Sequence, residues 1–288
     1  MSDSPQKYYV PHGSQWPIIG SISLFLMAFG AGSWLNGSDF GKYMTFAGLA
    51  GILYMIFGWF GEVIRESVKG MFQAKEDVSF RMGMIWFIMS EVMFFAAFFG
   101  ALFYARQLVV PWLGGEGSNF FTNLLLWSGY EAEWPTNGPD GLGGEFKTMS
   151  WAGLPLINTL LLLTSSVTIT IAHHALLRND RRWLNIGLFL TFALGFIFLY
   201  FQVLEYAHAY NDLNLKLSTG IYGSTFFMLT GFHGAHVTLG SIMLVVIWLR
   251  VLKGHFSPDN HFGFEAVAWY WHFVDVVWLG LFIFVYIL

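Results

Sequence analysis

The 288-residue sequence contains no cysteine. This absence excludes disulfides, iron–sulfur clusters, thiolate haem ligands and any copper or zinc site that takes sulfur from cysteine. A metal site would have to be built from the nine histidines and the carboxylates.

Charged residues are also scarce. They make up 11% of the chain, against about 25% in an average soluble domain, while 56% of the residues are hydrophobic. This composition is that of an integral membrane protein. The polar N-terminal segment, residues 1–16, lacks the basic stretch that begins a secretory signal, so we interpret it as a short cytoplasmic tail.

Long apolar stretches occupy most of the chain. A helix of about twenty apolar residues crosses the hydrocarbon core, and seven stretches satisfy this requirement, at about 16–35, 43–65, 80–107, 151–177, 183–209, 219–252 and 264–288. We predict an all-α integral membrane protein, with residues 1–288 forming a single seven-helix transmembrane domain. The sixth stretch exceeds the thickness of a bilayer, so we expect it to tilt or project. No internal repeat is visible, which disfavours an inverted-repeat transporter.

The basic residues predict the orientation. Ten of the fourteen lie in the N-terminal tail or after the second, fourth and sixth stretches: Lys7, Arg65, Lys69, Lys75, Arg81, Arg178, Arg181, Arg182, Arg250 and Lys253. The opposite side carries Lys42, Arg106, Lys147 and Lys216. Because basic residues favour the cytoplasmic side, we expect the N-terminus inside and the C-terminus outside.

The one long connection, at about 108–150, is predicted to lie on the outer side. It is rich in glycine and contains the acidic residues Glu116, Glu131, Glu133, Asp140 and Glu145. Loops of this length are often functional or contact a partner. A variable surface decoration is an equally good interpretation.

Glu91 lies in the middle of the third stretch, with Phe87, Ile88, Phe94 and Phe95 as its helical neighbours. A carboxyl in such surroundings is desolvated, which favours its neutral form. It would serve either as a protonated acid that hydrogen-bonds a neighbouring helix or as a group that handles protons.

His233 and His236 lie three residues apart, on one face of the sixth stretch. The small residues Gly231 and Gly234 allow another backbone to approach there. Two histidines on one face can ligate haem or a metal, but no known ligand spacing accompanies them. Hydrogen bonding between helices is the better interpretation.

Two acid–histidine pairs have the same three-residue spacing: Glu205 with His208, and His272 with Asp275. Ionisable groups inside a span are costly and normally face protein or a cavity. We interpret both pairs as structural partners between helices.

Polar residues gather at the predicted inner ends of the second and sixth stretches. The candidates for binding lipid headgroups are Trp59, Arg65, Glu66, Arg250, Lys253 and His255. Basic groups attract anionic headgroups and tryptophan anchors at the interface. Plain positive-inside topology with snorkelling side chains is the alternative. His173 and His174, at the end of the fourth stretch, are assigned no chemistry.

Several segments together resemble subunit III of the haem-copper cytochrome c oxidases. They are GEVIRESVKG at 61–70, WFIMSEVMFFAAFFGALFYAR at 86–106, FFMLTGFHGAHVTLGS at 226–241, HFGFEAVAWYWHFVDVVWLGLFIF at 261–284 and, more weakly, LPLINTLLLLTSSVTITIAHHALL at 154–177. The resemblance covers nearly the whole chain.

The resemblance implies two helix bundles, helices one and two against three to seven, with phospholipids in the cleft between them. Such subunits carry no redox centre, since haem and copper lie in partner subunits. The implied role is to bind subunit I, stabilise it during turnover and support proton uptake, with subunit II in the same complex and cytochrome c as the electron donor. The resemblance implies no nucleic-acid partner.

Individual positions carry over from the family. Glu91 matches its buried carboxylate, Arg65 and Glu66 match its Arg-Glu-Ser near headgroups, and Arg250, Lys253 and His255 match a basic group for acidic phospholipid. His233, His236, His272 and Asp275 match polar positions that we interpret as structural. The 108–150 loop departs from the family, being longer and more acidic than expected. A contact with the donor or with an extra subunit is one hypothesis for this loop. The loop style favours a bacterial inner membrane.

Three other functions remain open. An independent transporter with Glu91 as proton relay would be active alone in liposomes. A haem-carrying anchor ligated by His233, His236 or His272 would show a Soret band. Subunit III of a quinol oxidase is the nearest alternative, but that branch typically lacks the first two spans.

Overall fold

The computed structural model describes residues 13–72 and 74–288. Seven helices in this part of the chain are long and apolar enough to cross a membrane, and the only strand-like pairing there is an isolated bridge between Ser257 and Asn260. The predicted all-helical, seven-span architecture is confirmed. The N-terminal tail through His12, including Lys7, lies outside the described residues.

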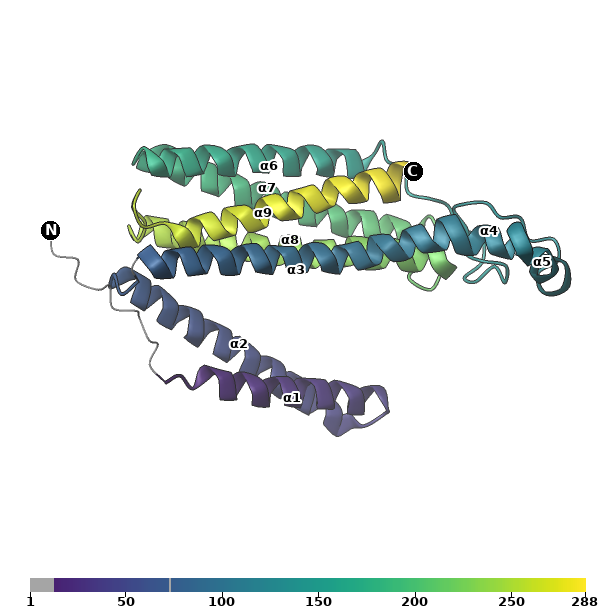
Figure 1. The fold of residues 1–288 in the computed structure, drawn as a ribbon, viewed down its shortest axis with the longest axis horizontal. Helices are drawn as coiled ribbons and strands as arrows, with labels where there is room; N and C mark the ends of the chain where they lie inside the picture. The colour runs from purple at the N-terminus through teal and green to yellow at the C-terminus, as the bar shows by residue number, and fades with distance from the viewer. Residues whose placement is uncertain (1–12, 73) are drawn as a thin grey trace. The chain divides into compact units, whose positions relative to one another are not determined.

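The chain divides into two compact units, one ending at Phe80 and the other beginning at Arg81. In the first unit, α1 (Trp16–Leu35) and α2 (Asp39–Val68) form a hairpin (Figure 1). A Cβ atom at Gly30, Gly41 or Gly48 would collide with the backbone of the opposite helix. Glycine at these positions therefore allows close helix packing, as in other membrane helix pairs.

The second unit contains the remaining long helices, which lie alongside one another (Figure 1). They are α3 (Ala74–Tyr104), α6 (Leu154–Leu177), α7 (Arg181–Asn211), α8 (Gly220–Leu252) and α9 (Phe262–Leu281). The first turns of α3 belong to the first unit, and α3 is continued by the π-helix η1 (Ala105–Val109) and by α4 (Val110–Leu113). The π-helix η3 (Phe282–Ile287) continues α9.

Two fully buried tryptophans of α9 fill the core of the second unit. The indole of Trp271 donates to Ser165 Oγ and that of Trp278 to Thr159 Oγ1, each at 2.9 Å. Gly195 on α7 and Gly240 on α8 make room for the Trp271 ring. A buried indole N–H needs a hydrogen-bond partner, so these contacts fix both the packing and the register of α9 against α6.

The third span is longer than predicted. It was expected to end near 107, but helical structure continues to Leu113, because the apolar run continues and Pro111 occupies the first turn of α4, where proline is tolerated. Gly114 caps it, and Gly115 follows at φ +90°.

The long connection therefore spans 114–153 and is partly helical. It contains the 3₁₀-helix η2 (Gly117–Asn119) and the short helix α5 (Phe120–Leu126). The Asn214 amide donates to the carbonyls of Gly143 and Glu145 at 3.0 and 2.9 Å, and the Tyr222 N–H donates to Thr136 O at 3.2 Å. These bonds hold the connection against the ends of α7 and α8.

Candidate functional site

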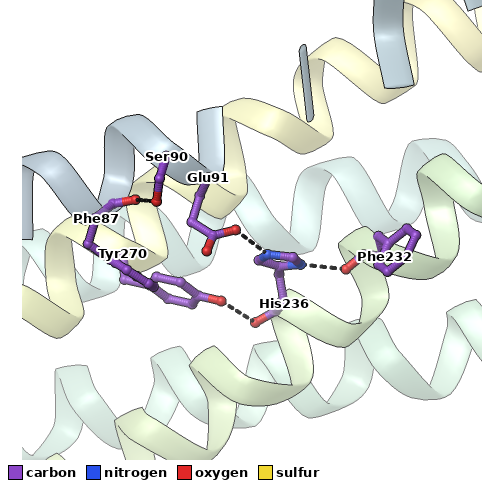
Figure 2. Close-up of polar contacts among 6 residues, drawn as sticks. All are labelled: Phe87, Ser90, Glu91, Phe232, His236 and Tyr270. Carbon is purple, nitrogen blue, oxygen red and sulfur yellow. Dashed lines mark hydrogen bonds and ion pairs between the residues drawn. The ribbon is translucent and has the colours of Figure 1, made fainter. Parts of the chain in front are cut away.

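Glu91 on α3 and His236 on α8 form a hydrogen-bonded pair within the second unit. Glu91 Oε2 lies 3.0 Å from His236 Nε2 (Figure 2). A bond from Glu91 to a neighbouring helix was one of the two roles that the sequence left open, but the sequence did not identify His236 as the partner.

The second ring nitrogen of His236 limits the proton arrangements of this pair. Nδ1 lies 2.7 Å from the Phe232 carbonyl, which can only accept, so Nδ1 carries a hydrogen (Figure 2). Nε2 then either accepts from a neutral Glu91 acid or, as part of an imidazolium, donates to a carboxylate. Both arrangements contain the same number of protons, so the pair shares one proton between Oε2 and Nε2.

Aromatic residues surround the pair. The ring centroids of Phe95 and Phe94 lie 4.9 and 5.9 Å from that of His236, and Tyr270 Oη donates to the His236 carbonyl at 3.4 Å. The Glu91 side chain is 23% exposed. The pair therefore lies at the surface of the second unit, among apolar rings that strengthen its electrostatic interaction.

The other intramembrane histidines bond to groups on neighbouring helices. His233 is fully buried, and its Nε2 lies 3.2 Å from the Val274 carbonyl. His272 Nδ1 lies 2.7 Å from Ser166 Oγ. In the part of the chain that is described, no group of three or more His, Cys, Asp or Glu side chains is placed to hold a metal.

The two acid–histidine pairs expected from the sequence are not joined by hydrogen bonds. Tyr286 Oη donates to Glu205 Oε1 at 2.5 Å, and His208 instead lies 2.6 Å from Asp212. Glu205 bonds a residue of another helix, whereas His208 bonds the residue that caps its own helix, so the spacing alone did not identify either partner.

Asp275 is likewise unpaired with His272. Its carboxyl is buried close to Ser166, but the Ser166 hydroxyl bonds His272, and neither Asp275 oxygen has a hydrogen-bond partner among the described residues.

The end of the second unit that contains the loop between α8 and α9 carries cations and buried nitrogens without hydrogen-bond partners. The Arg250 guanidinium lies over the Phe256 ring, 4.3 Å from its centroid, and Arg181 Nη2 donates to the Phe256 carbonyl at 2.8 Å. Of the buried nitrogens that have no hydrogen-bond partner among the described residues, four belong to the end of α8, the loop after it or the residue before α9: Trp248 Nε1, Arg250 Nε, His255 Nδ1 and His261 Nδ1. Lys253 is exposed nearby in sequence.

His255 lies in the loop beyond α8. Burial lowers the pKa of its imidazole below the ordinary value of 6.5, and the charges of Arg250 and Lys253 lower it further. The positive surroundings therefore favour an anion there more than another cation.

Sequence reasoning missed a polar network that joins α3, α6 and α9 at this end. Arg81 forms an ion pair with Glu265, His261 Nε2 lies 4.0 Å from the same carboxylate, and the His173 ring centroid lies 5.7 Å from that of His261. The four-residue spacing of His261 and Glu265 was visible in the sequence, but nothing there indicates that Arg81 is the partner.

The lipid candidates of the first unit lie at the end of α2. Trp59 is half exposed and stacks on Phe60, with ring centroids 5.8 Å apart. Arg65 is exposed in the last turn, and Glu66 follows it. Glu62, one turn earlier, accepts a 2.6 Å bond from the Trp16 indole.

Comparison with known proteins places these features in a family. The family model for cytochrome c oxidase subunit III matches residues 6–288. Cytochrome c oxidase subunit 3 of Dugong dugon is 40% identical over 287 residues, and those of Hippopotamus amphibius and Bos taurus are each 39% identical. Each alignment covers 99% of this chain and 98% of the relative. The chain therefore belongs to the cytochrome c oxidase subunit III family and is a membrane-spanning subunit of an oxidoreductase complex.

Proposed function

We propose that this chain, which carries no redox centre of its own, stabilises subunit I of the oxidase and supports its proton uptake, with phospholipids bound to it. The observation that carries the proposal is the Glu91–His236 pair. A carboxyl and an imidazole that share one proton form a site that can gain or lose a proton, at a depth where ionisable groups are otherwise rare.

The proposed role in proton uptake differs from that of an independent proton channel. The pair is partly exposed at the surface of the second unit, where a partner subunit can cover it. A covered pair would lose its remaining water, and the strength of the interaction between its carboxyl and its imidazole would then depend on contact with that partner. This dependence gives subunit III a means of influencing subunit I.

The unpaired nitrogens at the inner end support the proposal of phospholipid binding. Buried donors without partners are costly, and a phosphate headgroup offers several acceptor oxygens. Arg250, Lys253 and His255 would hold the headgroup. Trp59, Arg65 and Glu66 form the corresponding candidate site in the first unit.

The family resemblance supports the remaining assignments. We propose that haem and copper lie in subunits I and II and that cytochrome c is the electron donor to the complex. We also propose that the complex lies in a bacterial inner membrane. The basic residues of the second unit are divided unequally between its two ends. The loop of Arg178, Arg181 and Arg182 contacts the 253–261 loop at one end, and Lys147 and Lys216 lie near the opposite end. Because basic residues favour the cytoplasmic side, this distribution supports an N-terminus on the inner side.

The relatives make an independent transporter unnecessary as an explanation, and the histidine contacts disfavour a haem anchor. Both nitrogens of His236 have partners, as does one nitrogen each of His233 and His272. His236 could ligate a haem only by giving up one of these bonds, and no group of three or more possible metal ligands occurs among the described residues.

Depletion and add-back of the chain test the proposal. We expect the complex without this chain to take up protons more slowly and to inactivate after fewer turnovers, and we expect add-back to restore both properties. The control is add-back of a denatured preparation. Equal proton uptake and equal lifetime with and without the chain would overturn the proposed role.

A further inference from the structure

A second buried carboxyl lies far along the chain from Glu91 and has no role in the function proposed above. Glu205 is fully buried on α7, and Gln202, one turn before it, is 5% exposed. Tyr286 donates to Glu205 Oε1 at 2.5 Å, and the Gln202 amide lies close to both Glu205 and Tyr286 without a hydrogen bond of acceptable geometry.

Asn158 on α6 belongs to the same level of the unit. The hydroxyls of Thr168 on α6 and Thr191 on α7 lie 2.8 Å apart, and Gly187 lies against Ala172. Two residues that face each other across this antiparallel pair therefore have residue numbers that add up to about 359. This register places Asn158 opposite Phe201 and Gln202. Trp278 confirms the level, because it bonds Thr159 and its ring lies 5.9 Å from that of Tyr286.

Five polar atoms of this cluster lack hydrogen-bond partners among the described residues. They are both amide atoms of Asn158, both amide atoms of Gln202, and Glu205 Oε2. All three side chains are at least nine-tenths buried. Buried polar groups are normally hydrogen-bonded, and bound water supplies the bond where protein does not.

No cationic side chain forms an ion pair with Glu205 among the described residues, so a carboxylate there would be an uncompensated buried charge. His208 lies close enough for its charge to act on Glu205, but His208 is exposed and bonded to Asp212. Glu205 lies six residues before the end of α7, or about 9 Å at the helical rise. Water therefore has a short distance to travel from the outer surface.

We propose that Asn158, Gln202, Glu205 and Tyr286 form a buried water-binding site near the outer end of the second unit, through which the Glu205 acid exchanges its hydrogen with the outer aqueous phase. In this exchange the O–H bond of the acid breaks as bound water accepts the hydrogen, and that water returns one of its own hydrogens to the carboxyl. No net charge is created inside the protein.

The first test is a high-resolution map of the intact oxidase complex. We expect ordered water between the amides of Asn158 and Gln202 and the Glu205 carboxyl. A dry cluster, in which the amides bond the carboxyl directly after rotation of their side chains, would overturn the proposal. This measurement needs no variant, so it decides the matter even if substitutions prevent assembly.

The second test is infrared spectroscopy in heavy water. The protonated-acid carbonyl band that Glu205→Gln removes should shift as soon as the sample is mixed with heavy water, and Gln202→Leu should slow that shift severalfold. Asn185→Leu, which removes another amide of α7 that bonds only the Arg181 carbonyl, is the matched control and should leave the rate unchanged. A native band that does not shift over hours would contradict the proposal.

Discussion

His236 Nε2 lies 3.0 Å from Glu91 Oε2, and this one contact joins α8 to α3 through a shared proton. The Phe232 carbonyl fixes the hydrogen on Nδ1, so the imidazole presents Nε2 to the carboxyl in every protonation state considered above. The contact thus has two proposed roles: it stabilises the packing of α8 against α3, and it carries a proton. Substitutions can separate these two roles.

The packing role is tested by two substitutions of Glu91. Glu91→Gln retains a donor for Nε2, whereas Glu91→Leu leaves a polar nitrogen unpaired, which costs about 1–3 kcal/mol. We expect thermal unfolding of the purified complex to be nearly unchanged by Gln and lowered by Leu. Ser90→Ala, an adjacent change whose hydroxyl bonds only within α3, is the control. A Glu91→Leu variant as stable as the native complex would show that the contact does not stabilise the packing.

The fit of Trp271 against its two glycines predicts a sharp contrast between glycines of α8. A side chain at Gly240 would collide with the indole, while a Cβ at Gly234 meets no atom within 4 Å. Gly240→Leu should destabilise the complex by about 1–3 kcal/mol or more, as overpacking does. Gly234→Ala should be neutral or slightly stabilising. The unfolding temperatures of the two variants measure this, and equal temperatures would contradict the packing described.

Substitution of the cations at the end of α8 tests lipid binding. Arg250→Ala combined with Lys253→Ala should lower the acidic phospholipid retained by the purified complex and shorten its working lifetime. Lys147→Ala combined with Lys216→Ala removes the same charge near the opposite end and serves as the control. Lipid analysis that finds equal phospholipid in all three preparations would remove the assignment of this site.

The lowered pKa of His255 gives this site a pH dependence. Its neutral form is favoured in the folded protein, so its contribution to stability is present above pH 6.5 and declines as the pH falls through the lowered value. A bound anion would oppose this by favouring the protonated form, so lipid retention should rise as the pH falls below 6.5. Lipid content measured between about pH 5 and 8 should show this rise in the native complex and lose it in His255→Gln. A pH-independent lipid content in the native complex would contradict the prediction.

The seven spans followed from the sequence because hydrocarbon demands long apolar helices, and length alone identifies these. The partners of buried polar groups did not follow. Glu205 was matched with His208 by spacing, yet it bonds Tyr286, which lies 81 residues away. Such choices depend on helix register, which here is set by contacts such as Trp278 with Thr159. The third helix extended beyond its prediction because its apolar run continues to Leu113.

The central claim is that this subunit assists proton uptake through Glu91, and the most direct test measures that uptake in the intact complex. Reduced complex is mixed with oxygen, and a pH-indicator dye records protons taken up by the native protein, Glu91→Gln and the Ser90→Ala control. Assembly and haem content are checked in each preparation. We predict slower uptake in Glu91→Gln alone. An uptake rate equal to that of the native complex, in a fully assembled Glu91→Gln preparation, would contradict the claim and leave Glu91 as a packing residue.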